Sequence, residues 1–475
     1  MALVEPAFLL FALISCLLYR CTSRHDSLRP FVLVALSLFF YSTWNPWYCL
    51  PITLTALLDY NTSWLLVRMR GARARGLLVS ADIALNLLIL ALFKGFNFLH
   101  QSIAQFLTVF GRTLPPAPFR VVFMVGISFY TFQSMSYVID VYRGEQKPAR
   151  GFLEYFAFVS FFPTLLAGPI TRASVLLTQL QQPAAALTDE QGSRALLMIA
   201  RGFIKKLVFA DYLAVNLVDR AFELPRMFSS VEILIAVYAF AVQIYCDFSG
   251  YSDIAIGVAQ LLGFHLPDNF NSPYRSESLI EFWRRWHISF STWLRDYIFF
   301  SLPSSRRSRW RPYWNTLVTF ALGGIWHGAS WNFLIWGLLH GFGLAVNHGV
   351  ETLWPRRGKL RPKKLAARIA GVVPTFHFVC LTWIFFRCDS ARQALEVLTG
   401  LARGSTETIN IPWPVPVLIT LALLAQWCPV DWYRRAETWF AAWPATVQAA
   451  ALSGAALLIA WTSRTVVTQF IYFKF

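Results

Sequence analysis

The stretch Thr316-Leu-Val-Thr-Phe-Ala-Leu-Gly-Gly-Ile-Trp-His-Gly-Ala-Ser-Trp-Asn-Phe-Leu-Ile-Trp-Gly-Leu338 decides the fold class of this chain. It contains no Lys, Arg, Asp or Glu, and its one ionisable side chain is His327. Lipid tails offer no hydrogen-bond partner, so an ionisable ring in such a segment is costly and is a candidate functional group. The small residues Gly323, Gly324 and Gly328 leave room for a closely packed helix or for a bound chain. A histidine hydrogen-bonded to a neighbouring helix and a catalytic histidine both fit this segment.

The composition extends this conclusion to the whole chain. Of 475 residues, 56% are hydrophobic and only 14% are charged, which predicts a polytopic membrane protein. The apolar runs are continuous rather than alternating, so an all-α bundle is expected and a β-barrel is not. The net charge of +17 comes from Lys and Arg in short loops, as in membrane proteins, and nucleic acid is not an expected partner. The seven cysteines form no CxxC pair, and no metal site is expected.

Apolar runs that could form membrane spans recur along the chain. They cover residues 3–19, 31–50, 51–67, 77–93, 120–142, 152–168, 195–217, 231–248, 315–339, 369–386, 415–427 and 446–461. The third, sixth and eleventh are short for the roughly 20 residues that cross a bilayer, so we expect them to be broken or re-entrant. Pro46 and Pro163 lie where such breaks would occur. Without a soluble segment, linker or repeat, residues 1–475 are expected to form a single membrane domain.

Basic loops predict the orientation. One contains Arg20, Arg24 and Arg29, and further basic loops at residues 68–75 and 143–150 follow after every second span. The intervening connections carry little positive charge, which places the N-terminus outside and the basic loops in the cytoplasm. The most basic loop, residues 356–368, is also expected in the cytoplasm.

The segment from Glu281 to Tyr297 is too polar to face lipid and too aromatic for a solvated loop. If it is one helix, it carries an aromatic stripe and a polar stripe, and it lies either at the membrane interface or inside the bundle. The aromatic stripe consists of Phe282, Trp286, Phe290, Trp293 and Tyr297, and the polar stripe of Arg284, His287, Ser291 and Arg295. An interfacial helix would need no chemistry, but so many charged groups exceed what anchoring requires.

His287 and His327 are the candidate catalytic residues. A neutral imidazole can take a proton from a hydroxyl and return it, and a hydroxyl activated in this way can attack an acyl carbonyl. The sequence contains no G-x-S-x-G elbow, no P-loop and no H-E-x-x-H helix that would indicate another chemistry. Asp247 and Asp253 flank Gly250 in a pattern that fits a metal or acid–base pair, but we expect this segment to cap and bend a helix.

A set of ordered motifs carries a family resemblance. They are Gly126-Ile-Ser-Phe-Tyr-Thr-Phe-Gln, Phe161-Phe-Pro-Thr-Leu-Leu-Ala-Gly-Pro-Ile-Thr-Arg172, Tyr245-Cys-Asp-Phe-Ser-Gly-Tyr-Ser-Asp253, Asn269-Phe-Asn-Ser-Pro-Tyr-Arg275, Glu281-Phe-Trp-Arg-Arg-Trp-His-Ile-Ser289, Gly324-Ile-Trp-His-Gly-Ala329, Trp383-Ile-Phe-Phe-Arg387 and Phe470-Ile-Tyr-Phe-Lys-Phe475. From about residue 30 to the end, the chain resembles the membrane-bound O-acyltransferase family. It is most similar to the bacterial branch that serves alginate O-acetylation and teichoic acid D-alanylation.

The resemblance implies a funnel-like helical bundle with a central tunnel and short re-entrant or interfacial helices. The family's two signature positions fall on His327, the catalytic residue, and His287. Further residues of these motifs are predicted to bind substrate: Arg285, Trp286, Trp326, Asn271, Asp247 and Ser249. The donor would be acetyl-CoA or another acyl thioester, with no bound cofactor. The acceptor would be an exported polysaccharide, with an extracytoplasmic acetyltransferase as partner, at the bacterial inner membrane.

Two alternatives remain at this point. The acyl group could be D-alanyl delivered by a carrier protein, or the protein could transport a donor or glycan without chemistry. A transporter would need charged residues on several spans, whereas the ionisable groups are concentrated between Asp247 and His327. Two features depart from the family pattern: residues 300–309 lack the usual glycine-containing turn, and Lys474 replaces a usual glutamine. His340, thirteen residues after His327, is the other histidine to examine.

Overall fold

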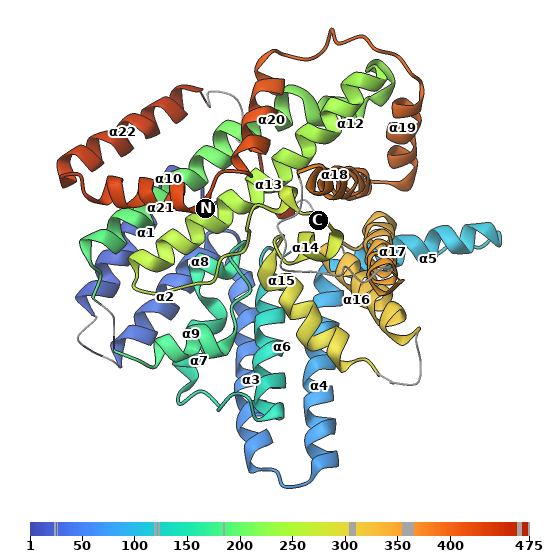
Figure 1. Cartoon of the computed structure of the whole chain (residues 1–475). Helices are drawn as coiled ribbons and strands as arrows, with labels where there is room; N and C mark the ends of the chain where they lie inside the picture. The colour runs from blue at the N-terminus through green and yellow to red at the C-terminus, as the bar shows by residue number, and fades with distance from the viewer. Residues whose placement is uncertain are drawn as a thin grey trace. The chain divides into compact units, whose positions relative to one another are not determined.

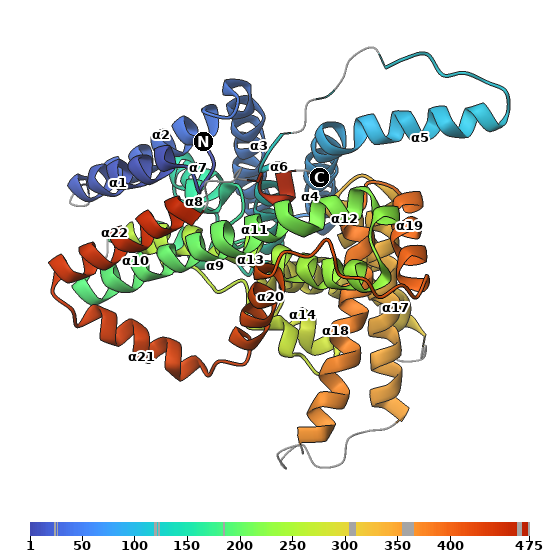
Figure 2. The ribbon, with the colours of Figure 1, turned by 90° about the horizontal axis from the view of Figure 1, so that it is seen from above.

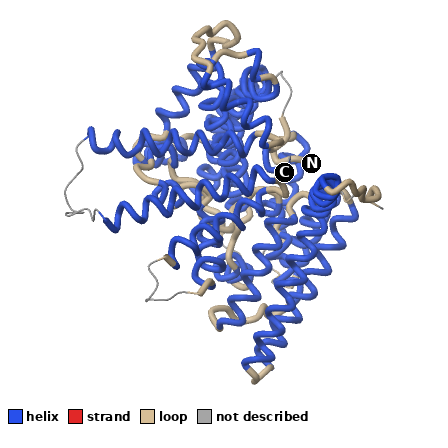
Figure 3. The backbone as a smooth tube through the Cα atoms, turned by 90° about the vertical axis from the view of Figure 1, so that its right-hand side faces the viewer, coloured by secondary structure: helices blue, strands red, loops and turns tan. Residues whose placement is uncertain are grey.

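The computed structural model describes residues 1–22, 25, 27–117, 121, 124–183, 186–303, 310–353, 365–462 and 468–473. Regular structure in these residues is entirely helical, so the predicted all-α class is confirmed (Figure 3). Several predicted features lie outside the described residues: Arg24, residues 304–309 of the atypical turn, most of the basic loop 356–368, and Lys474. Contacts divide the chain into two compact units, residues 1–199 with 252–267, and residues 200–251 with 268–475.

The first unit is built around three neighbouring helices, α3, α4 and α6, which pack side by side (Figure 1). Its elements are α1 (Pro6–Cys21), α2 (Leu28–Ser42), η1 (Pro46–Tyr48), α3 (Cys49–Arg68), α4 (Ala72–Leu90), η2 (Ala91–Gly95), α5 (Phe96–Val109), α6 (Ile127–Arg143), α7 (Phe152–Ser160), α8 (Phe162–Leu165), α9 (Ala173–Leu180) and most of α10 (Asp189–Phe203). Helix α7 packs against α2 and α3.

The second unit contains a helical hairpin, α16 and α17, with α18 alongside α17 (Figure 2). Its elements are η3 (Ile204–Ala210), α11 (Asp211–Leu213), η4 (Ala214–Val218), α12 (Asp219–Glu223), η5 (Pro225–Met227), most of α13 (Ser230–Leu261), η6 (Pro273–Arg275), α14 (Leu279–Trp283), α15 (Ile288–Trp293), η7 (Leu294–Ile298), η8 (Phe299–Ser301), α16 (Arg311–His327), α17 (Trp331–Leu353), α18 (Leu365–Arg387), α19 (Ala391–Ala402), α20 (Pro414–Ala425), α21 (Val430–Ala441), α22 (Ala445–Thr462) and η9 (Ile471–Phe473).

Fewer helices could cross a membrane than the twelve apolar runs suggest. Within the described residues, four are long and apolar enough, covering Ala72–Val109, Ser230–Leu261, Trp331–Leu353 and Leu365–Arg387, and a fifth span is possible if the bent pair α20–α21 counts as one. The predicted break in the eleventh run is confirmed, because α20 and α21 meet at 96°. The break at Pro163 is also confirmed, between α7 and α8, and η1 begins at Pro46. The third run is not broken, since α3 is one helix of 20 residues.

Three local predictions are wrong. The run 315–339 is not one helix, because α16 ends at His327 and α17 starts at Trp331. Residues 247–253 do not cap a helix, since they lie inside the 32-residue helix α13. The segment 281–297 is not one amphipathic helix either. It breaks after α14 and restarts at α15, so the two stripes derived from a continuous helix do not exist.

Glycine determines how closely α16 and α17 approach one another. A Cβ atom on Gly324 would lie 2.2 Å from the carbonyl oxygen of Phe333, and one on Gly337 would lie 2.3 Å from that of Phe320. No side chain fits at either position, so the two backbones can touch only because both residues are glycine. This confirms the prediction that the small residues around His327 serve close helix packing, and it fixes the turn that follows His327.

Candidate active site

His287 is held in an unusual backbone conformation. It lies in the turn between α14 and α15 with φ of 43°, in the left-handed region that non-glycine residues rarely adopt. Its side chain is fully buried, and its Nδ1 lies 3.1 Å from Oδ1 of Asn269. That oxygen also accepts hydrogen bonds from the backbone N–H and the hydroxyl of Ser289, at 3.3 and 2.9 Å. Because Oδ1 only accepts, Nδ1 of His287 carries the proton, which leaves Nε2 as the acceptor nitrogen.

Burial sets the protonation state of His287. His287 does not lie in any of the helices that could cross a membrane, and its ring is enclosed by protein. This burial lowers its pKa to about 3. The ring is therefore neutral at physiological pH. Such a ring is a weak proton acceptor, but its Nε2 can still accept a hydrogen bond from a hydroxyl. This favours an orienting role for His287 over proton abstraction.

His327 comes from a different element. It is the last residue of α16, directly before Gly328, and only 2% of its surface is exposed. The carboxyl end of a helix carries partial negative charge, which stabilises a positive charge on a ring that has accepted a proton. Its ring lies 5.0 Å from that of Trp336 and 5.3 Å from that of Phe386. The position of His327 therefore suits a group that becomes transiently protonated.

Shared aromatic neighbours join the two histidines into one site. The ring of Phe290 lies 5.0 Å from both imidazoles. Tyr472 lies 6.5 Å from His287 and 5.5 Å from His327, and Trp326 lies 6.4 and 5.0 Å away. Two positions forty residues apart thus meet in one buried, aromatic-walled site. We call His287, His327, Phe290, Trp326 and Tyr472 the histidine site.

The C-terminal segment enters this site because a buried ion cluster holds it. Nζ of Lys206 lies 2.7 Å from a carboxylate oxygen of Asp211 and 2.7 Å from one of Asp247. The same ammonium group donates to the carbonyl oxygen of Thr468 at 3.0 Å, and the N–H of Ile471 donates to Asp247 at 2.8 Å. We call Lys206, Asp211 and Asp247 the lysine clamp. It fixes the chain at Thr468 and Ile471, directly before Tyr472, which approaches the histidines.

Comparison with known proteins identifies the family. The model of the membrane-bound O-acyltransferase family, MBOAT, matches residues 148–387, which include both histidines. The chain belongs to this family. It is therefore a multi-pass membrane protein and an O-acyltransferase. The predicted family and enzyme class are confirmed.

Individual relatives match longer parts of the acyltransferase than the family model does. It is 36% identical to a protein named probable alginate O-acetylase of Pseudomonas aeruginosa over 377 residues, 78% of this chain and 69% of that protein. It is 30% identical to the peptidoglycan O-acetyltransferase of Helicobacter pylori over 420 residues, 83% and 78% of the two chains. Its identity to the teichoic acid D-alanyltransferase of Bacillus subtilis is 29% over 317 residues, 62% and 78% of the two chains.

Arg285 and Asn271, both predicted to bind substrate, form a pair within the acyltransferase. The guanidinium of Arg285 lies 2.9 Å from a carboxylate oxygen of Glu281, and it donates to the carbonyl oxygen of Asn271 at 3.1 Å. The N–H of Asn271 donates back to the carbonyl oxygen of Arg285 at 2.9 Å. These bonds fix the loop that carries Asn269, which in turn orients His287. The structure thus gives Arg285 a positioning contact, and its predicted donor contact stays a prediction.

The remaining predicted site residues lie in different surroundings. Trp326 belongs to the histidine site, with its ring 4.6 Å from that of Phe290. Trp286 faces other aromatic rings, with Trp383 at 5.0 Å and Phe282 at 5.6 Å. Ser249 is buried on α13, and Asp247 belongs to the lysine clamp. Their roles in substrate binding stay predictions.

His340 has a complete hydrogen-bond set. The indole N–H of Trp283 donates to its Nδ1 at 3.3 Å, so its Nε2 carries the proton and donates to the hydroxyl of Thr382 at 2.9 Å. That hydroxyl donates in turn to the carbonyl oxygen of Val379 at 2.8 Å. His340 therefore ties α14, α17 and α18 together, and the structure gives it a packing role.

Sequence reasoning missed Lys206, Asp211 and Tyr472 as site residues. A signal for the first two existed, because an ionisable pair within the apolar run 195–217 should have been treated as a candidate site. The aromatic tail entered only as part of the family resemblance. Its approach to the histidines depends on long-range contacts such as that between Ile471 and Asp247, which no local pattern reveals.

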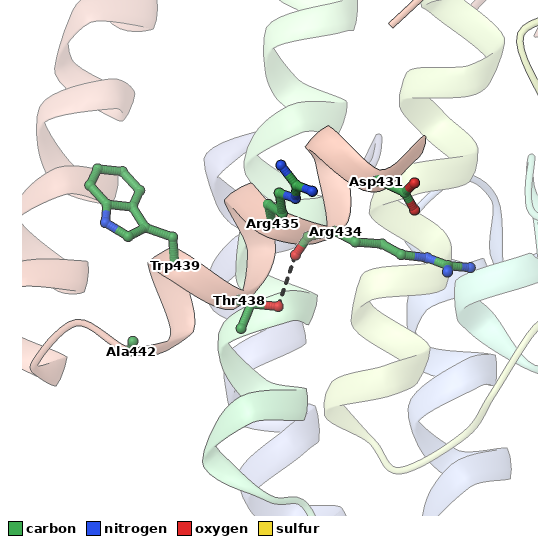
Figure 4. A pocket seen from close by; sticks show the side chains of 6 residues that line it. All are labelled: Asp431, Arg434, Arg435, Thr438, Trp439 and Ala442. Carbon is green, nitrogen blue, oxygen red and sulfur yellow. Dashed lines mark hydrogen bonds between the residues drawn. The ribbon is translucent and has the colours of Figure 1, made fainter. Parts of the chain in front are cut away.

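A pocket elsewhere on the acyltransferase contains none of these residues. Its lining comes from α21 and the turn that follows, as Figure 4 shows: Asp431, Arg434, Arg435, Thr438, Trp439 and Ala442. These side chains are exposed, and the hydroxyl of Thr438 donates to the carbonyl oxygen of Arg434 within its own helix. Exposed arginines and a tryptophan on an amphipathic helix are typical of the membrane–water interface. We therefore place no chemistry there.

Proposed function

We propose that this acyltransferase O-acetylates an exported polysaccharide with an acetyl group taken from a cytoplasmic thioester such as acetyl-CoA. The observation that carries the proposal is that His287 and His327, from separate elements, contact the same two rings, Phe290 and Tyr472. A site of this kind supplies one imidazole to remove the proton of the attacking hydroxyl and one to orient the acceptor through a neighbouring hydroxyl. That arrangement fits acyl transfer and requires no bound cofactor.

The identity of the relatives favours acetyl over D-alanyl. The proteins named for alginate or peptidoglycan O-acetylation match 83% or more of this chain in several cases, at 30% to 36% identity. Those named for teichoic acid D-alanylation match 55% and 62% of it, at 29%. D-alanyl transfer remains the second candidate because the two groups share the family. An alginate-like polymer or a cell-wall glycan is the proposed acceptor class.

In the proposed reaction, His327 removes the proton of the attacking hydroxyl, and Nε2 of His287 accepts a hydrogen bond from a neighbouring hydroxyl of the acceptor and so orients it. The hydroxyl oxygen bonds to the carbonyl carbon of the thioester, the carbon–sulfur bond breaks, and the thiolate takes up the proton from His327. The negative end of α16 stabilises the imidazolium that exists between these steps. Proton transfer by a positioned group typically contributes 10²- to 10⁴-fold to the rate.

The proposed topology follows the positive-inside rule. The N-terminus lies outside, the basic loops around Arg20, Arg68 and Arg143 lie in the cytoplasm, and the membrane is the bacterial inner membrane. A tunnel of the kind implied by the family would bring the thioester to the histidines. An extracytoplasmic acetyltransferase is the proposed partner for delivery to the polymer, as the resemblance to the bacterial branch of the family implies.

Replacing His327 tests the proposal directly. In a deletion strain complemented with His327→Ala, we expect ester-linked acetyl on the surface polysaccharide to fall at least 100-fold, while the protein accumulates normally in the membrane. His348→Ala is the matched control, since it removes an exposed imidazole from α17 and should retain acetylation. Unchanged acetyl content in His327→Ala would refute the role. If ester-linked D-alanine disappears instead, the second candidate is correct.

A further inference from the structure

Two aspartates form a buried pair in the three-helix core of the first unit. Asp59 on α3 is fully buried, and Asp82 on α4 is 3% exposed. The two carboxyl groups interact with each other directly, and Asn86, one turn after Asp82, bonds to both. We call Asp59 and Asp82, together with Asn86, the acid pair. Asp59 and Asp82 lie outside the segment from Asp247 to His327, where the ionisable groups were expected to be concentrated.

Neutral donors surround Asp59. The hydroxyl of Ser134 and the hydroxyl of Tyr155 donate to its Oδ2, the latter at 3.3 Å, and the amide of Asn86 donates to its Oδ1 at 2.9 Å. Ser134 and Tyr155 are themselves 2.9 Å apart. Asp59 is therefore well solvated by protein groups from α4, α6 and α7. These groups are neutral, however, and they stabilise one negative charge rather than removing it.

Two oxygen atoms of the group lack any hydrogen-bond partner. They are Oδ1 of Asp82 and Oδ1 of Asn86, on successive turns of the same face of α4. Asn86 is only 1% exposed, so bulk water does not reach its amide. An orphaned buried acceptor is destabilising, and two beside a carboxylate pair are unusual. A positive charge beside them would satisfy both atoms and balance the carboxylate pair.

The chain does not supply that charge. In the part of the chain that the structure describes, no Lys, Arg or His forms an ion pair with Asp59 or Asp82. Lys94, further along the same span, donates instead to Ser128 at 3.3 Å. Two neighbouring carboxylates inside a helical membrane bundle cannot both stay ionised without a compensating charge.

We propose that Asp59, Asp82 and Asn86 form a binding site for a monovalent cation, supplied either as Na⁺ or as a proton. Carboxylate, amide and hydroxyl oxygens are hard ligands that suit an alkali ion. Two carboxylates are few for a divalent ion, and no cluster of three His, Cys, Asp or Glu side chains occurs among the described residues. One bound cation leaves a single negative charge, which Ser134, Tyr155 and the Asn86 amide hold. The site is independent of the proposed acetylation.

Thermal unfolding of the purified full-length protein in detergent tests this site. The melting temperature is measured in NaCl and in choline chloride of equal ionic strength, at one mildly acidic and one alkaline pH. If Na⁺ is the ligand, NaCl raises the melting temperature at alkaline pH by roughly 1–2 °C for each ten-fold increase in concentration above Kd. If the ligand is a proton, the melting temperature does not depend on the Na⁺ concentration but falls as the pH rises.

Substitutions assign either response to the acid pair. Asp82→Asn keeps the shape of the side chain and removes one charge, so it should abolish the response to Na⁺ or to pH. Glu232→Gln is the matched control, because Glu232 is a buried carboxylate in the second unit with backbone N–H donors from Ser229 and Asn410. It should keep the response of the parent protein.

The proposal is overturned if the parent protein and Asp82→Asn respond identically to both Na⁺ and pH. If Asp82→Asn does not accumulate, Asp59→Asn takes its place. Saturable binding of radioactive Na⁺ to the unmodified protein is measured alongside. The absence of binding together with a pH response that Asp59→Asn retains would also overturn the site.

Discussion

The lysine clamp of the second unit and the acid pair of the first unit each bury two carboxyl groups, but they differ in how the negative charge is balanced. Each brings two aspartates together, Asp211 with Asp247 and Asp59 with Asp82, and all four are nearly inaccessible to solvent. Only the clamp contains a cation of the chain itself, the ammonium group of Lys206 at 2.7 Å from both partners. Around Asp59 and Asp82 the described groups are neutral.

This difference separates a permanent connection from an exchangeable one. A lysine cannot leave, so the clamp is always closed and suits a mechanical task, the fixing of the C-terminal segment beside the histidines. A cation from solution can leave, so the acid pair makes the first unit sensitive to its surroundings. Each of the following predictions tests this difference between a cation supplied by the chain and a cation supplied from solution.

The largest effect is expected from Lys206→Met. It leaves two buried carboxylates without their cation, and breaking a buried ion pair in this way typically costs about 3–5 kcal/mol. We expect acyl transfer to disappear and less protein to accumulate, measured as acetyl content and as protein in the membrane fraction. The triple variant Lys206→Met, Asp211→Asn, Asp247→Asn removes all three charges and should accumulate better. If the triple variant also accumulates no better than Lys206→Met, uncompensated charge is not the cause.

A smaller effect separates the two carboxylates of the clamp. Asp247 holds both the ammonium group of Lys206 and the N–H of Ile471, whereas Asp211 bonds to Lys206 and the side chain of Thr468. We therefore expect Asp247→Asn to lower acyl transfer about ten-fold or more, the effect of roughly 1.4 kcal/mol, and Asp211→Asn to lower it less. Protease cleavage of a C-terminal tag should accelerate in the same order. Equal effects on both measurements would mean that the bond to Ile471 does not hold the segment.

Converting the acid pair into a clamp is the sharpest test of the contrast. Asn86→Lys places an ammonium group one turn from Asp82 and within reach of Asp59, as Lys206 does for its partners. We expect the melting temperature of this variant to lose its response to Na⁺ and to pH, a change of a few degrees. Asn86→Met has similar length without the charge and should not reproduce the effect. A retained response in Asn86→Lys would show that the occupant sits elsewhere.

The sequence predicted the elements of the histidine site better than their geometry. Composition and unbroken apolar runs were sufficient for the all-α class, since helices satisfy their own backbone in lipid. His327 was singled out because an imidazole in an apolar segment is exceptional, and the structure places it and His287 beside shared aromatic rings, while their catalytic roles stay predictions. However, periodicity suggested one helix from 281 to 297, and the left-handed turn at His287 interrupts it. The bond between Asn269 and His287 that stabilises this turn joins separate motifs, so helical spacing does not reveal it.

The acid pair and the lysine clamp were missed for a related reason. Asp59 and Asp82 each occur singly in an otherwise apolar run, where one charge resembles a residue at the end of a span, and Lys206 follows Lys205 in a run that was read only as a membrane span. Their partners come from other helices, at separations of 23 residues for the aspartates and 41 for Lys206 and Asp247, counted from the sequence numbers. Only tertiary packing turns these isolated charges into clusters.

His287 illustrates a third way to bury an ionisable group, as a neutral ring, and this gives the smallest expected effect. Burial lowers its pKa to about 3, below the value of about 6.5 in an unfolded chain, so the unfolded state binds more protons between these values. The resulting stability is complete above about pH 6.5 and is lost as the pH falls towards 3. From pH 7 to pH 5.5 the parent should lose about 1 kcal/mol of unfolding free energy that His287→Gln does not lose. Melting curves of the two proteins at both pH values measure this difference, and parallel shifts would mean that the ring is protonated in the folded state.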